Sequence, residues 1–568
     1  VLFEGAAYDY KHGPQPTSEG QWYWRDAGGA RWFIDVDGQE LEASVEYLGH
    51  EYGPERQVAA MRFALVAGDT RLELTEQPEI VERNGETVLV RVFRNTQDGE
   101  LPLAGFYTGT DERYMASGAL EFRLADAKPI TPISGPDRGR EPGAGELSEG
   151  ESIIAGSDCL SCHGETHRIA GPAWSQIAGK FRGKVQDEVV ASLATKVIKG
   201  GAGNWGSVPM PPHPEMTRAQ ATAAVAYILS VPVVDQDFDP PLDSDGNPYR
   251  ITQAYDVLPR LDSLHPSFQL ENLAPQGFEP KVGGMDFRSD GKLLVATWDT
   301  DGAVYLVDPE ATDSERVTRI AEGLHEPLGL TVVDDRVFVL QKQELTELID
   351  STGDGFMDTY KVVADNWAAN SNFHSFAFGL VHRDDAFYFL LSICVLPGGA
   401  SCPDQLPTQG KLLKVTLGGE VSEYAAGFRT PNGIALGPDG ELWVNDNQGD
   451  WLPSSKLAQV KEGDFYGSRA VPEPGIMERV EEPPAAWLPQ DEVGNSPTEP
   501  LFLVDGPYAG QAIHGDVYNG GLKRVYLETV GERPQGAVFH FSAGLQLSLI
   551  HISEPTRPIL VSRMPSSA

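Results

Sequence analysis

The feature that most constrains the fold is a segment that recurs four times at a spacing near 50 residues. Each copy is a β-forming run, a polar hairpin turn and a second β-forming run, as in G-G-M-D-F-R-S-D-G-K-L-L-V-A-T-W from Gly283. A period of this length is typical of β-propeller blades. The sequence therefore predicts a propeller over residues 265–546, with four evident blades and a fifth over 500–546. The equivalent glycines, spaced 45, 50 and 54 residues apart, are Gly284, Gly329, Gly379 and Gly433.

The N-terminal segment, residues 1–125, also has the pattern of an all-β domain. Runs of β-forming residues are separated by turn signals such as Asp37-Gly38 and Asn84-Gly85. This pattern predicts an antiparallel β-sandwich. A Pro- and Gly-rich linker follows over residues 126–147.

Residues 148–233 change to a helical pattern and predict a small all-α domain. Gln186–Lys199 places its apolar residues on one face. Thr217-Arg-Ala-Gln220 is a capping box, and the helix that it opens runs to about Ser230. An acidic, Pro-rich linker over 234–264 separates this domain from the repeats.

The C-terminal tail, residues 547–568, is excluded from fold reasoning. It resembles, residue for residue, the translation of a transposase sequencing adapter followed by flow-cell primer sequence. We expect the tail to be an artefact, with natural sequence ending near Gln546. On this interpretation the propeller is incomplete.

The charge of the chain excludes two classes of partner. The formal net charge is −39, from 44 Lys and Arg against 83 Asp and Glu. Nucleic acids and anionic membranes would repel such a protein. No apolar run approaches the roughly 18 residues that a membrane span needs. We interpret the charge as a solubility feature.

Residues 157–164, S-D-C-L-S-C-H-G, contain a C-x-x-C-H motif formed by Cys159, Cys162 and His163. This motif is a signature of c-type haem attachment, because two thiols can add to the porphyrin vinyl groups while the adjacent imidazole reaches the iron. Zinc would need a second ligand pair, and the remaining cysteines lie far away in another domain. A thiol–disulfide motif would follow a strand in an α/β unit, whereas this region is helical in pattern. The motif therefore predicts covalently bound haem c.

An electron-transfer haem takes a second axial ligand, commonly a Met thioether. Met210, held between Pro209 and Pro211, is presented rigidly, and we predict it as this ligand. The alternatives are Met216 and His213. Met216 opens the capped helix and is poorly placed, while His213 would lower the potential relative to Met.

Residues 148–233 resemble the small class I bacterial cytochromes of the c-551 type. The matching pieces are C-L-S-C-H, I-A-G-P-A-W, G-N-W-G-S-V-P-M-P-P and Y-I-L-S in the closing helix. The resemblance implies that His163 is the proximal iron ligand and Met210 the distal one. It also implies that Pro172 offers its carbonyl oxygen to the second imidazole nitrogen, and that Trp205 hydrogen-bonds a haem propionate.

Haem attachment of this kind takes place outside the cytoplasm, so the resemblance implies a periplasmic or cell-surface protein. The chain starts at Val1 without a charged-then-apolar leader. We expect either that a signal peptide was removed or that the N-terminus is incomplete. In an oxidising compartment Cys394 and Cys402, eight residues apart, are expected to form a disulfide.

The repeat region contains the pieces G-L-H-E-P-L-G-L, F-H-S-F-A-F-G-L, G-F-R-T-P-N-G-I-A-L-G-P-D-G, N-D-N-Q-G-D-W-L-P-S-S-K-L and G-D-F-Y-G. Through these pieces it resembles the quinoprotein glucose and sorbosone dehydrogenase-like propellers, and more closely the membrane-bound dehydrogenase-like domains fused to cytochromes in planctomycete-type bacteria. The resemblance implies that His374 is the general base for hydride removal and that Arg429 contacts pyrroloquinoline quinone. Asn447–Asp450 would lie near a calcium-binding loop. We identify no lysine for the cofactor.

A second candidate calcium site is the stretch D-S-T-G-D-G-F-M-D. It resembles part of a calcium loop, with Asp350, Asp354 and Asp358 as oxygen donors. An EF-hand loop has Glu as its twelfth residue, whereas the twelfth residue counted from Asp350 is Lys361, so the stretch is not an EF-hand. An acidic turn between blades is the alternative interpretation.

These observations favour an exported c-type cytochrome that receives electrons from a dehydrogenase-like propeller acting on a sugar or alcohol. Its haem would pass them to a redox partner protein or respiratory chain. The rival hypothesis is a cell-surface protein whose propeller binds a glycan or a partner without catalysis, and whose cytochrome serves a separate redox partner. Substrate binding without turnover would favour the rival.

Overall fold

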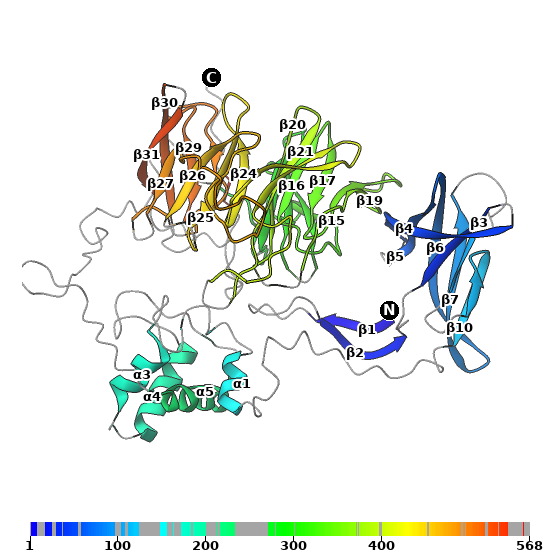
Figure 1. The fold of residues 1–568 in the computed structure, drawn as a ribbon, viewed down its shortest axis with the longest axis horizontal. Coiled ribbons are helices and arrows are strands. Elements are labelled where there is room, and N and C mark those ends of the chain that lie inside the picture. The colour runs from blue at the N-terminus through cyan, green and yellow to red at the C-terminus, as the bar shows by residue number, and fades with distance from the viewer. Residues whose placement is uncertain are drawn as a thin grey trace, which may run out of the picture.

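The computed structural model of the chain contains three kinds of unit: a strand-rich N-terminal part, a small group of helices and an array of four-stranded sheets (Figure 1). This arrangement confirms the expected multidomain fold. The structure describes residues 2–7, 17–24, 30–36, 38–54, 58–96, 104–107, 112–123, 148–155, 159, 163, 172–182, 184, 186–199, 213, 216–232, 271–278, 280–299, 301–370, 372, 374–396, 400–450, 452, 454–489, 492–494, 496–516, 521–531, 533–542 and 560–561.

The N-terminal part has two β layers that share one long strand, β4 (Gln39–Tyr52). The first half of β4 pairs with β3 (Arg31–Val36) and its second half with β5 (Val58–Ala67). Trp32 on β3 packs against Phe63 and Phe93 of the other layer, at ring-centroid distances of 5.3 and 5.9 Å. The expected antiparallel sandwich is thus confirmed. The other strands are β1 (Leu2–Ala7), β2 (Thr17–Trp24), β6 (Thr70–Arg83), β7 (Glu86–Asn95), β8 (Ala104–Tyr107), β9 (Arg113–Met115) and β10 (Gly118–Arg123).

The helical part contains α1 (Glu149–Ala155), α3 (Trp174–Phe181), α4 (Gln186–Lys199) and α5 (Arg218–Ser230). The capping box at the start of α5 is confirmed. Thr217 Oγ1 accepts the Gln220 N–H at 3.2 Å, and Gln220 Oε1 accepts the Thr217 N–H at 2.9 Å. Apolar residues of α1, α3 and α5 form a common core. None of the helices in the described part of the chain is long and apolar enough to cross a membrane.

The repeats fold into five antiparallel groups of four strands, here called blades 1 to 5; four of them are separate sheets, and the strands of blade 2 belong to a sheet that continues into the N-terminal part. This result confirms the propeller architecture and the fifth blade expected over 500–546. The strands are β12 (Val282–Phe287), β13 (Leu293–Thr297), β14 (Val304–Val307) and β15 (Val317–Ala321) in blade 1; β16 (Gly329–Val333), β17 (Arg336–Leu340), β18 (Leu345–Ile349) and β19 (Thr359–Ala364) in blade 2; β20 (Ala377–Arg383), β21 (Ala386–Leu391), β22 (Lys411–Thr416) and β23 (Val421–Ala426) in blade 3; β24 (Thr430–Leu436), β25 (Leu442–Asn447), β26 (Ser455–Val460) and β27 (Ala486–Leu488) in blade 4; and β28 (Leu501–Phe502), β29 (Ala512–Gly515), β30 (Leu522–Val530) and β31 (Arg533–Ser542) in blade 5.

The repeated glycines lie where the first strands of successive blades touch. A Cβ on Gly284 would lie 2.7 Å from the backbone nitrogen of Leu330 in blade 2. A Cβ on Gly329 would lie 2.8 Å from the carbonyl carbon of Gly379, and one on Gly379 would lie 2.8 Å from the backbone nitrogen of Ile434. No side chain fits at these contacts, which explains why each repeat carries a glycine there.

The sandwich and blade 2 are joined by strand pairing. The sequence places residues 1–125 in a domain separate from the propeller and does not predict this pairing. The outer strand β19 pairs antiparallel with the end of β4, beside which it lies in Figure 1. Tyr360 is opposite His50, and their rings stack at 4.6 Å. A Cβ on Gly49 would lie 1.9 Å from the Tyr360 carbonyl oxygen, so this junction requires glycine.

Two residues of the C-terminal tail are described. They form β32 (Leu560–Val561), which pairs with β11 (Glu271–Asn272) ahead of blade 1. The adapter origin of residues 547–568 stays a prediction.

Candidate functional site

The first candidate site is the imidazole of His163 in the helical part. His163 is 7 % exposed, and its Nδ1 lies 2.7 Å from the Pro172 carbonyl oxygen. Its ring stacks on Trp174 at a centroid distance of 4.4 Å. Burial lowers the pKa of His163, which favours the neutral imidazole that binds metals. Because Nδ1 is engaged by Pro172, Nε2 is the nitrogen that can reach a metal.

One of the two predicted haem-binding cysteines lies close to His163. The His163 N–H donates to the Cys159 carbonyl oxygen at 3.0 Å, which places the thiol one helical turn before the imidazole. Two thiols and a neutral imidazole are the donor set that covalently attached haem requires. The predicted residues Cys162, Trp205 and Met210 lie outside the described residues.

The two alternative axial ligands are described. His213 is 8 % exposed, and its N–H donates to the Val197 carbonyl oxygen at the end of α4, at 3.0 Å. It is close enough to His163 for its charge to contribute to the lowered pKa of that imidazole. Met216 directly precedes the Thr217 cap, as the sequence indicates, and packs against a small apolar core between α4 and α5. Met210 as the distal ligand stays a prediction.

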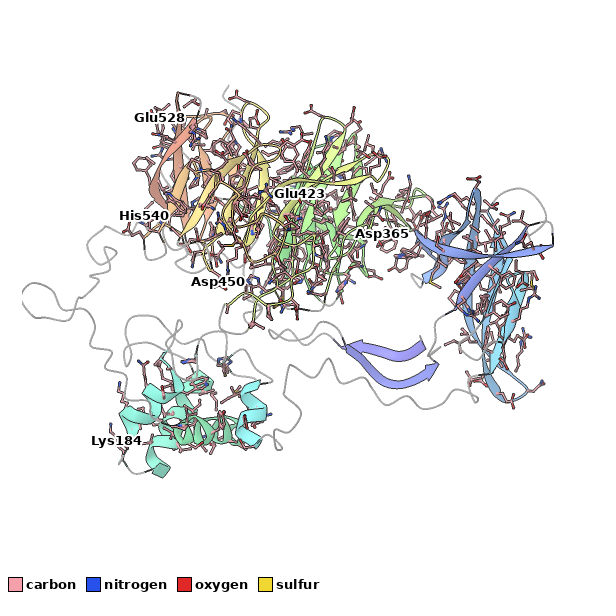
Figure 2. All side chains as sticks on the ribbon, in the orientation of Figure 1. Lys184, Asp365, Glu423, Asp450, Glu528 and His540 are labelled. Atoms are coloured by element: carbon pink, nitrogen blue, oxygen red, sulfur yellow. A yellow bond between two sulfur atoms is a disulfide. The ribbon has the colours of Figure 1, made fainter. Side chains whose placement is uncertain are left out.

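The second candidate site lies on one face of the propeller. In each blade the first two strands form an antiparallel pair, so the first strand begins where the second ends. We call the face at which the first strands begin the site face. His374 precedes β20 and Arg429 precedes β24, which places both predicted residues on this face in neighbouring blades. Asp450, after β25, marks the same edge in Figure 2, and Glu528 lies at the opposite edge.

Arg429 is held by a buried carboxylate and by a glycine. Its side chain is 6 % exposed, and Asp446 accepts the backbone N–H groups of Arg429 and Thr430 at 3.1 and 2.9 Å. Burial raises the pKa of Asp446 to about 6. A Cβ on Gly449 would lie 1.7 Å from Arg429 Nε, so the guanidinium packs directly on the backbone of this glycine. The predicted stretch 447–450 therefore lies against Arg429.

His374 is fixed through its backbone on both sides. Its N–H donates to Asn372 Oδ1 at 2.9 Å, and its carbonyl oxygen accepts from Ser392 Oγ at 2.5 Å. The half-buried imidazole lies 5.5 Å from the ring of Phe376. A residue held in this way is preorganised, as catalytic groups require.

A disulfide loop after β21 connects the segments of His374 and Arg429. The disulfide between Cys394 and Cys402, expected from the compartment, is present. On one side of the loop, Asn372 Nδ2 donates to the Val395 carbonyl oxygen at 3.0 Å. On the other side, the Ser401 N–H donates to Asp450 Oδ2 at 2.6 Å.

The sequence reasoning missed a histidine on the site face. His325 stands four residues before the repeat glycine Gly329, and His374 stands five residues before Gly379, so the repeat carries this signal only when the alignment allows a gap of one residue. His325 Nδ1 lies 2.9 Å from Gln343 Oε1. Its Nε2 is buried and has no hydrogen-bond partner among the described residues.

Two buried lysines in blades 2 and 4 were also not singled out. Lys342 donates to Glu326 Oε2 at 3.2 Å and to the Asn372 carbonyl oxygen at 3.4 Å. Lys456 donates to the Tyr466 carbonyl oxygen and to Glu481 Oε1. Both ammonium groups are engaged by protein acceptors.

The expected calcium donors accept hydrogen bonds from backbone N–H groups of their own turn. Asp350 accepts the N–H groups of Gly353 and Gly355 at 2.6 and 2.9 Å, and Asp358 accepts the Ser351 N–H at 3.2 Å. Asp354 accepts the N–H of Phe356. The described residues contain no group of three or more His, Cys, Asp or Glu side chains suited to a metal ion. These hydrogen bonds are compatible with an acidic turn between blades, and calcium at Asp350, Asp354 and Asp358 stays a prediction.

Comparison with known proteins gives matches in both regions. Residues 147–232 match the cytochrome c family. Cytochrome c-551 of Allochromatium vinosum is 44 % identical over 77 residues, 13 % of this chain and 78 % of that protein. A glucose dehydrogenase-type oxidoreductase of Thermus thermophilus is similar in structure at 19 % identity and a TM-score of 0.38, over 49 % of this chain and 88 % of that one. The PQQ-bound aldose sugar dehydrogenase of Streptomyces coelicolor gives 17 % identity and a TM-score of 0.36, over 48 % and 86 %.

Proposed function

The chain belongs to the cytochrome c family through residues 147–232, and we propose that it is an exported electron-transfer protein whose propeller oxidises a sugar or alcohol. One observation carries the proposal. His374 and Arg429 lie on the same face of neighbouring blades, in a chain that also contains a cytochrome c domain. The haem would receive electrons from this face and pass them to a redox partner protein or respiratory chain.

In this proposal Cys159 and Cys162 attach the haem, while His163 and Met210 bind its iron. Bound haem c supplies one-electron transfer. The hydrogen bond from His163 Nδ1–H to the Pro172 carbonyl oxygen supports the role of His163, because it fixes the tautomer and leaves Nε2 for the metal.

Two neighbours complete the proposed haem environment. Trp174 stacks on the proximal imidazole and shields one side of it from water. Trp205 is proposed to donate its indole N–H to a haem propionate, as the resemblance to c-551 cytochromes implies. Both residues would orient the haem, and neither would itself be oxidised or reduced.

On the site face, His374 and Arg429 take separate roles. Arg429 suits a carboxylate-bearing cofactor such as pyrroloquinoline quinone, because its guanidinium is a buried cation with a fork of donors. That quinone, when bound, supplies a two-electron acceptor for hydride. His374 accepts the proton of the substrate hydroxyl, so that a carbonyl forms as hydride leaves the same carbon.

The compartment follows from two independent features. Covalent haem attachment and the Cys394–Cys402 disulfide both belong to an oxidising environment outside the cytoplasm. We therefore propose a periplasmic or cell-surface location.

The test is a dehydrogenase assay with an artificial dye as electron acceptor. The intact haem protein is supplied with pyrroloquinoline quinone and a panel of sugars and alcohols. At least one substrate should reduce the dye, and the His374→Ala variant should lose this activity while keeping its haem spectrum. Tight binding of a sugar without any dye reduction would overturn the catalytic role and favour a binding propeller.

A further inference from the structure

Two opposite charges are buried in blade 2 and take no part in the proposed chemistry. The side chains of Glu326 and Lys342 are 2 % and 3 % exposed, and Lys342 Nζ lies 3.2 Å from Glu326 Oε2. Burial lowers the pKa of Lys342, and Glu326 opposes this effect. A buried ion pair is weak evidence of a stabilising role, because apolar side chains of similar volume often stabilise a fold as well. Its presence beside the site face therefore needs another explanation.

The backbone around this pair is strained and tightly held. Glu326 has φ +50°, a left-handed conformation that is uncommon for residues other than glycine. The adjacent His325 N–H donates to Gln341 Oε1 at 2.6 Å, and the His325 carbonyl oxygen accepts the Lys342 N–H at 3.1 Å. Such strain persists only where surrounding contacts enforce it, and it gathers at functional sites.

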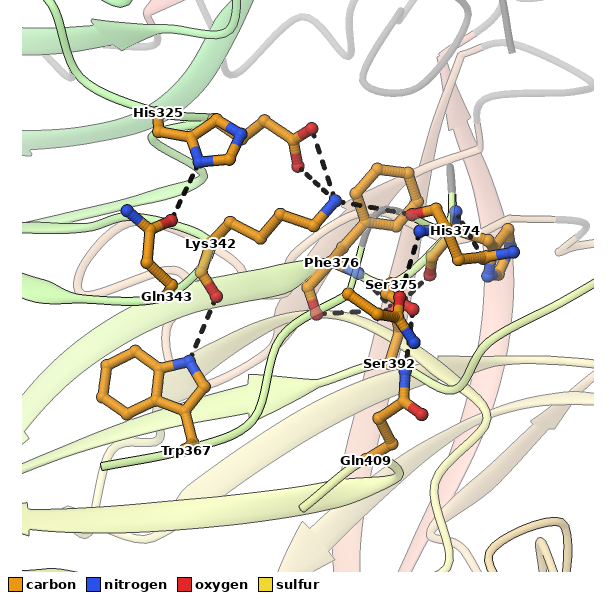
Figure 3. A network of polar contacts seen from close by, with 12 residues as sticks. His325, Lys342, Gln343, Trp367, His374, Ser375, Phe376, Ser392 and Gln409 are labelled. Carbon is orange, nitrogen blue, oxygen red and sulfur yellow. Dashed lines mark hydrogen bonds and ion pairs between the residues drawn. The ribbon is translucent and has the colours of Figure 1, made fainter. Parts of the chain in front are cut away.

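Hydrogen bonds connect the ion pair to His374 in the next blade. Lys342 Nζ donates to the Asn372 carbonyl oxygen at 3.4 Å. The side chain of Asn372 in turn accepts the His374 N–H at 2.9 Å and donates to the Val395 carbonyl oxygen at 3.0 Å. Figure 3 shows the continuous path of polar contacts from Lys342 to the segment of His374.

We propose that Glu326, Lys342 and Asn372 form a clamp between blades 2 and 3 that sets the position of the His374 imidazole. Glu326 orients the ammonium group, Lys342 holds the Asn372 carbonyl, and Asn372 holds the backbone of His374. All three are positioning residues, because each acts on the His374 imidazole only through another residue or through the backbone. The clamp rests on the proposed role of His374 as a general base.

The test compares variants of the full-length haem protein by three readouts. Lys342→Met breaks the ion pair, and Glu326→Gln combined with Lys342→Met removes both charges while keeping side-chain volume. Asn372→Ala removes the last link. Asn445→Ala is the matched control, because Asn445 is a fully buried asparagine whose Nδ2 donates to a backbone oxygen, that of Thr498, at 2.7 Å. The readouts are melting temperature, the rate at which diethyl pyrocarbonate modifies His374 as mapped by mass spectrometry, and dye-linked turnover.

The clamp predicts a specific pattern. Lys342→Met and Asn372→Ala should raise the modification rate of His374 several-fold and lower kcat on the order of 100-fold, with a smaller change in KM. The double variant should recover the melting temperature but keep the raised modification rate and the low kcat. His540 in blade 5 should react at the same rate in every variant, and Asn445→Ala should leave His374 unchanged.

Two results would separate the failure of the clamp from the failure of the proposed function. If the double variant restores both stability and the reactivity of His374, the pair is only structural and the clamp is wrong. If Lys342→Met does not fold, the double variant and Asn372→Ala decide the question alone. A wild-type protein without turnover would remove the proposed function, while the modification rates would still show whether the three residues hold His374.

Discussion

At the scale of single residues, the contact between Arg429 and Gly449 is the most sensitive point of the site face. A Cβ at position 449 would lie 1.7 Å from Arg429 Nε, within a buried environment that cannot yield easily. We expect Gly449→Ala to displace the guanidinium and weaken binding of pyrroloquinoline quinone about ten-fold, or about 1.4 kcal/mol. Titration calorimetry measures this affinity.

The control for this substitution is Gly418→Ala in blade 3. A Cβ at position 418 would have its nearest neighbour, Thr416 Oγ1, at 3.7 Å, which is an ordinary contact. Quinone affinity should remain at the wild-type value in this variant. An equal loss in both variants, or in neither, would contradict the proposed role of Arg429.

Because His514 is buried, we expect the stability of blade 5 to depend on pH. Burial lowers its pKa from 6.5 to about 4, so the unfolded chain binds a proton more readily than the folded one between these pH values. Stability is therefore retained above pH 6.5 and lost as the pH falls toward 4, by a total of about 3 kcal/mol. Hydrogen exchange of the β29 and β30 amides, measured between pH 7 and pH 4.5 after correction for intrinsic rates, should show this loss (~2–3 kcal/mol over that range).

A variant without the imidazole isolates the contribution of His514. His514→Gln should have a flatter dependence of blade 5 protection on pH, whereas His382→Gln in blade 3 should keep the wild-type slope in blade 5. If the wild-type slope survives in His514→Gln, another group is responsible for the acid sensitivity.

The residues of the site face could be predicted from the sequence only in part. His374, Arg429 and His325 each stand four or five residues before the glycine of a repeat, just ahead of the first strand of a blade. Asn372 and Lys342 have no such signal, because their roles depend on hydrogen bonds between blades that no local spacing encodes. Calcium at these aspartates stays a prediction, because the hydrogen bonds of Asp350 and Asp358 to nearby backbone N–H groups occur in acidic turns as well as in metal loops.

At the scale of elements, the blades were predictable because their signals are local. A β-hairpin and a glycine at each blade-to-blade contact recur with a fixed period, and the helices carry their own caps and apolar faces. The pairing of β4 with β19 was not predictable. It joins strands about 300 residues apart through unpaired edges, and edge pairing leaves no periodic pattern in either strand.

Gly49 is the residue that permits this pairing. Its φ is +126°, and a Cβ added to it would lie only 1.9 Å from the Tyr360 carbonyl oxygen, so Gly49→Ala should separate β4 from β19. We expect faster hydrogen exchange in β19 and in the second half of β4, with no change in β16 to β18. Gly68→Ala is the control, since Gly68 also has a positive φ but open space around its Cβ position. If hydrogen exchange in β19 is unchanged in Gly49→Ala, the pairing of β4 with β19 does not require glycine at this position.

At the scale of the whole molecule, the proposed function combines a haem and an oxidising site in one chain. The cytochrome c domain, residues 147–232, is set between segments that the sequence predicts to be Pro-rich linkers, and the propeller carries the proposed oxidising site. If the two functions belong together, substrate oxidation on the propeller must appear as reduction of the haem in the same molecule, without any added mediator.

Anaerobic stopped-flow spectroscopy of the intact protein, loaded with pyrroloquinoline quinone and mixed with its best sugar or alcohol substrate, tests this claim most directly. We expect the haem spectrum to change from the oxidised to the reduced form at a rate independent of protein concentration, and we expect His374→Ala to abolish the change. A haem that stays oxidised with every substrate, although a chemical reductant reduces it at once, would contradict the account.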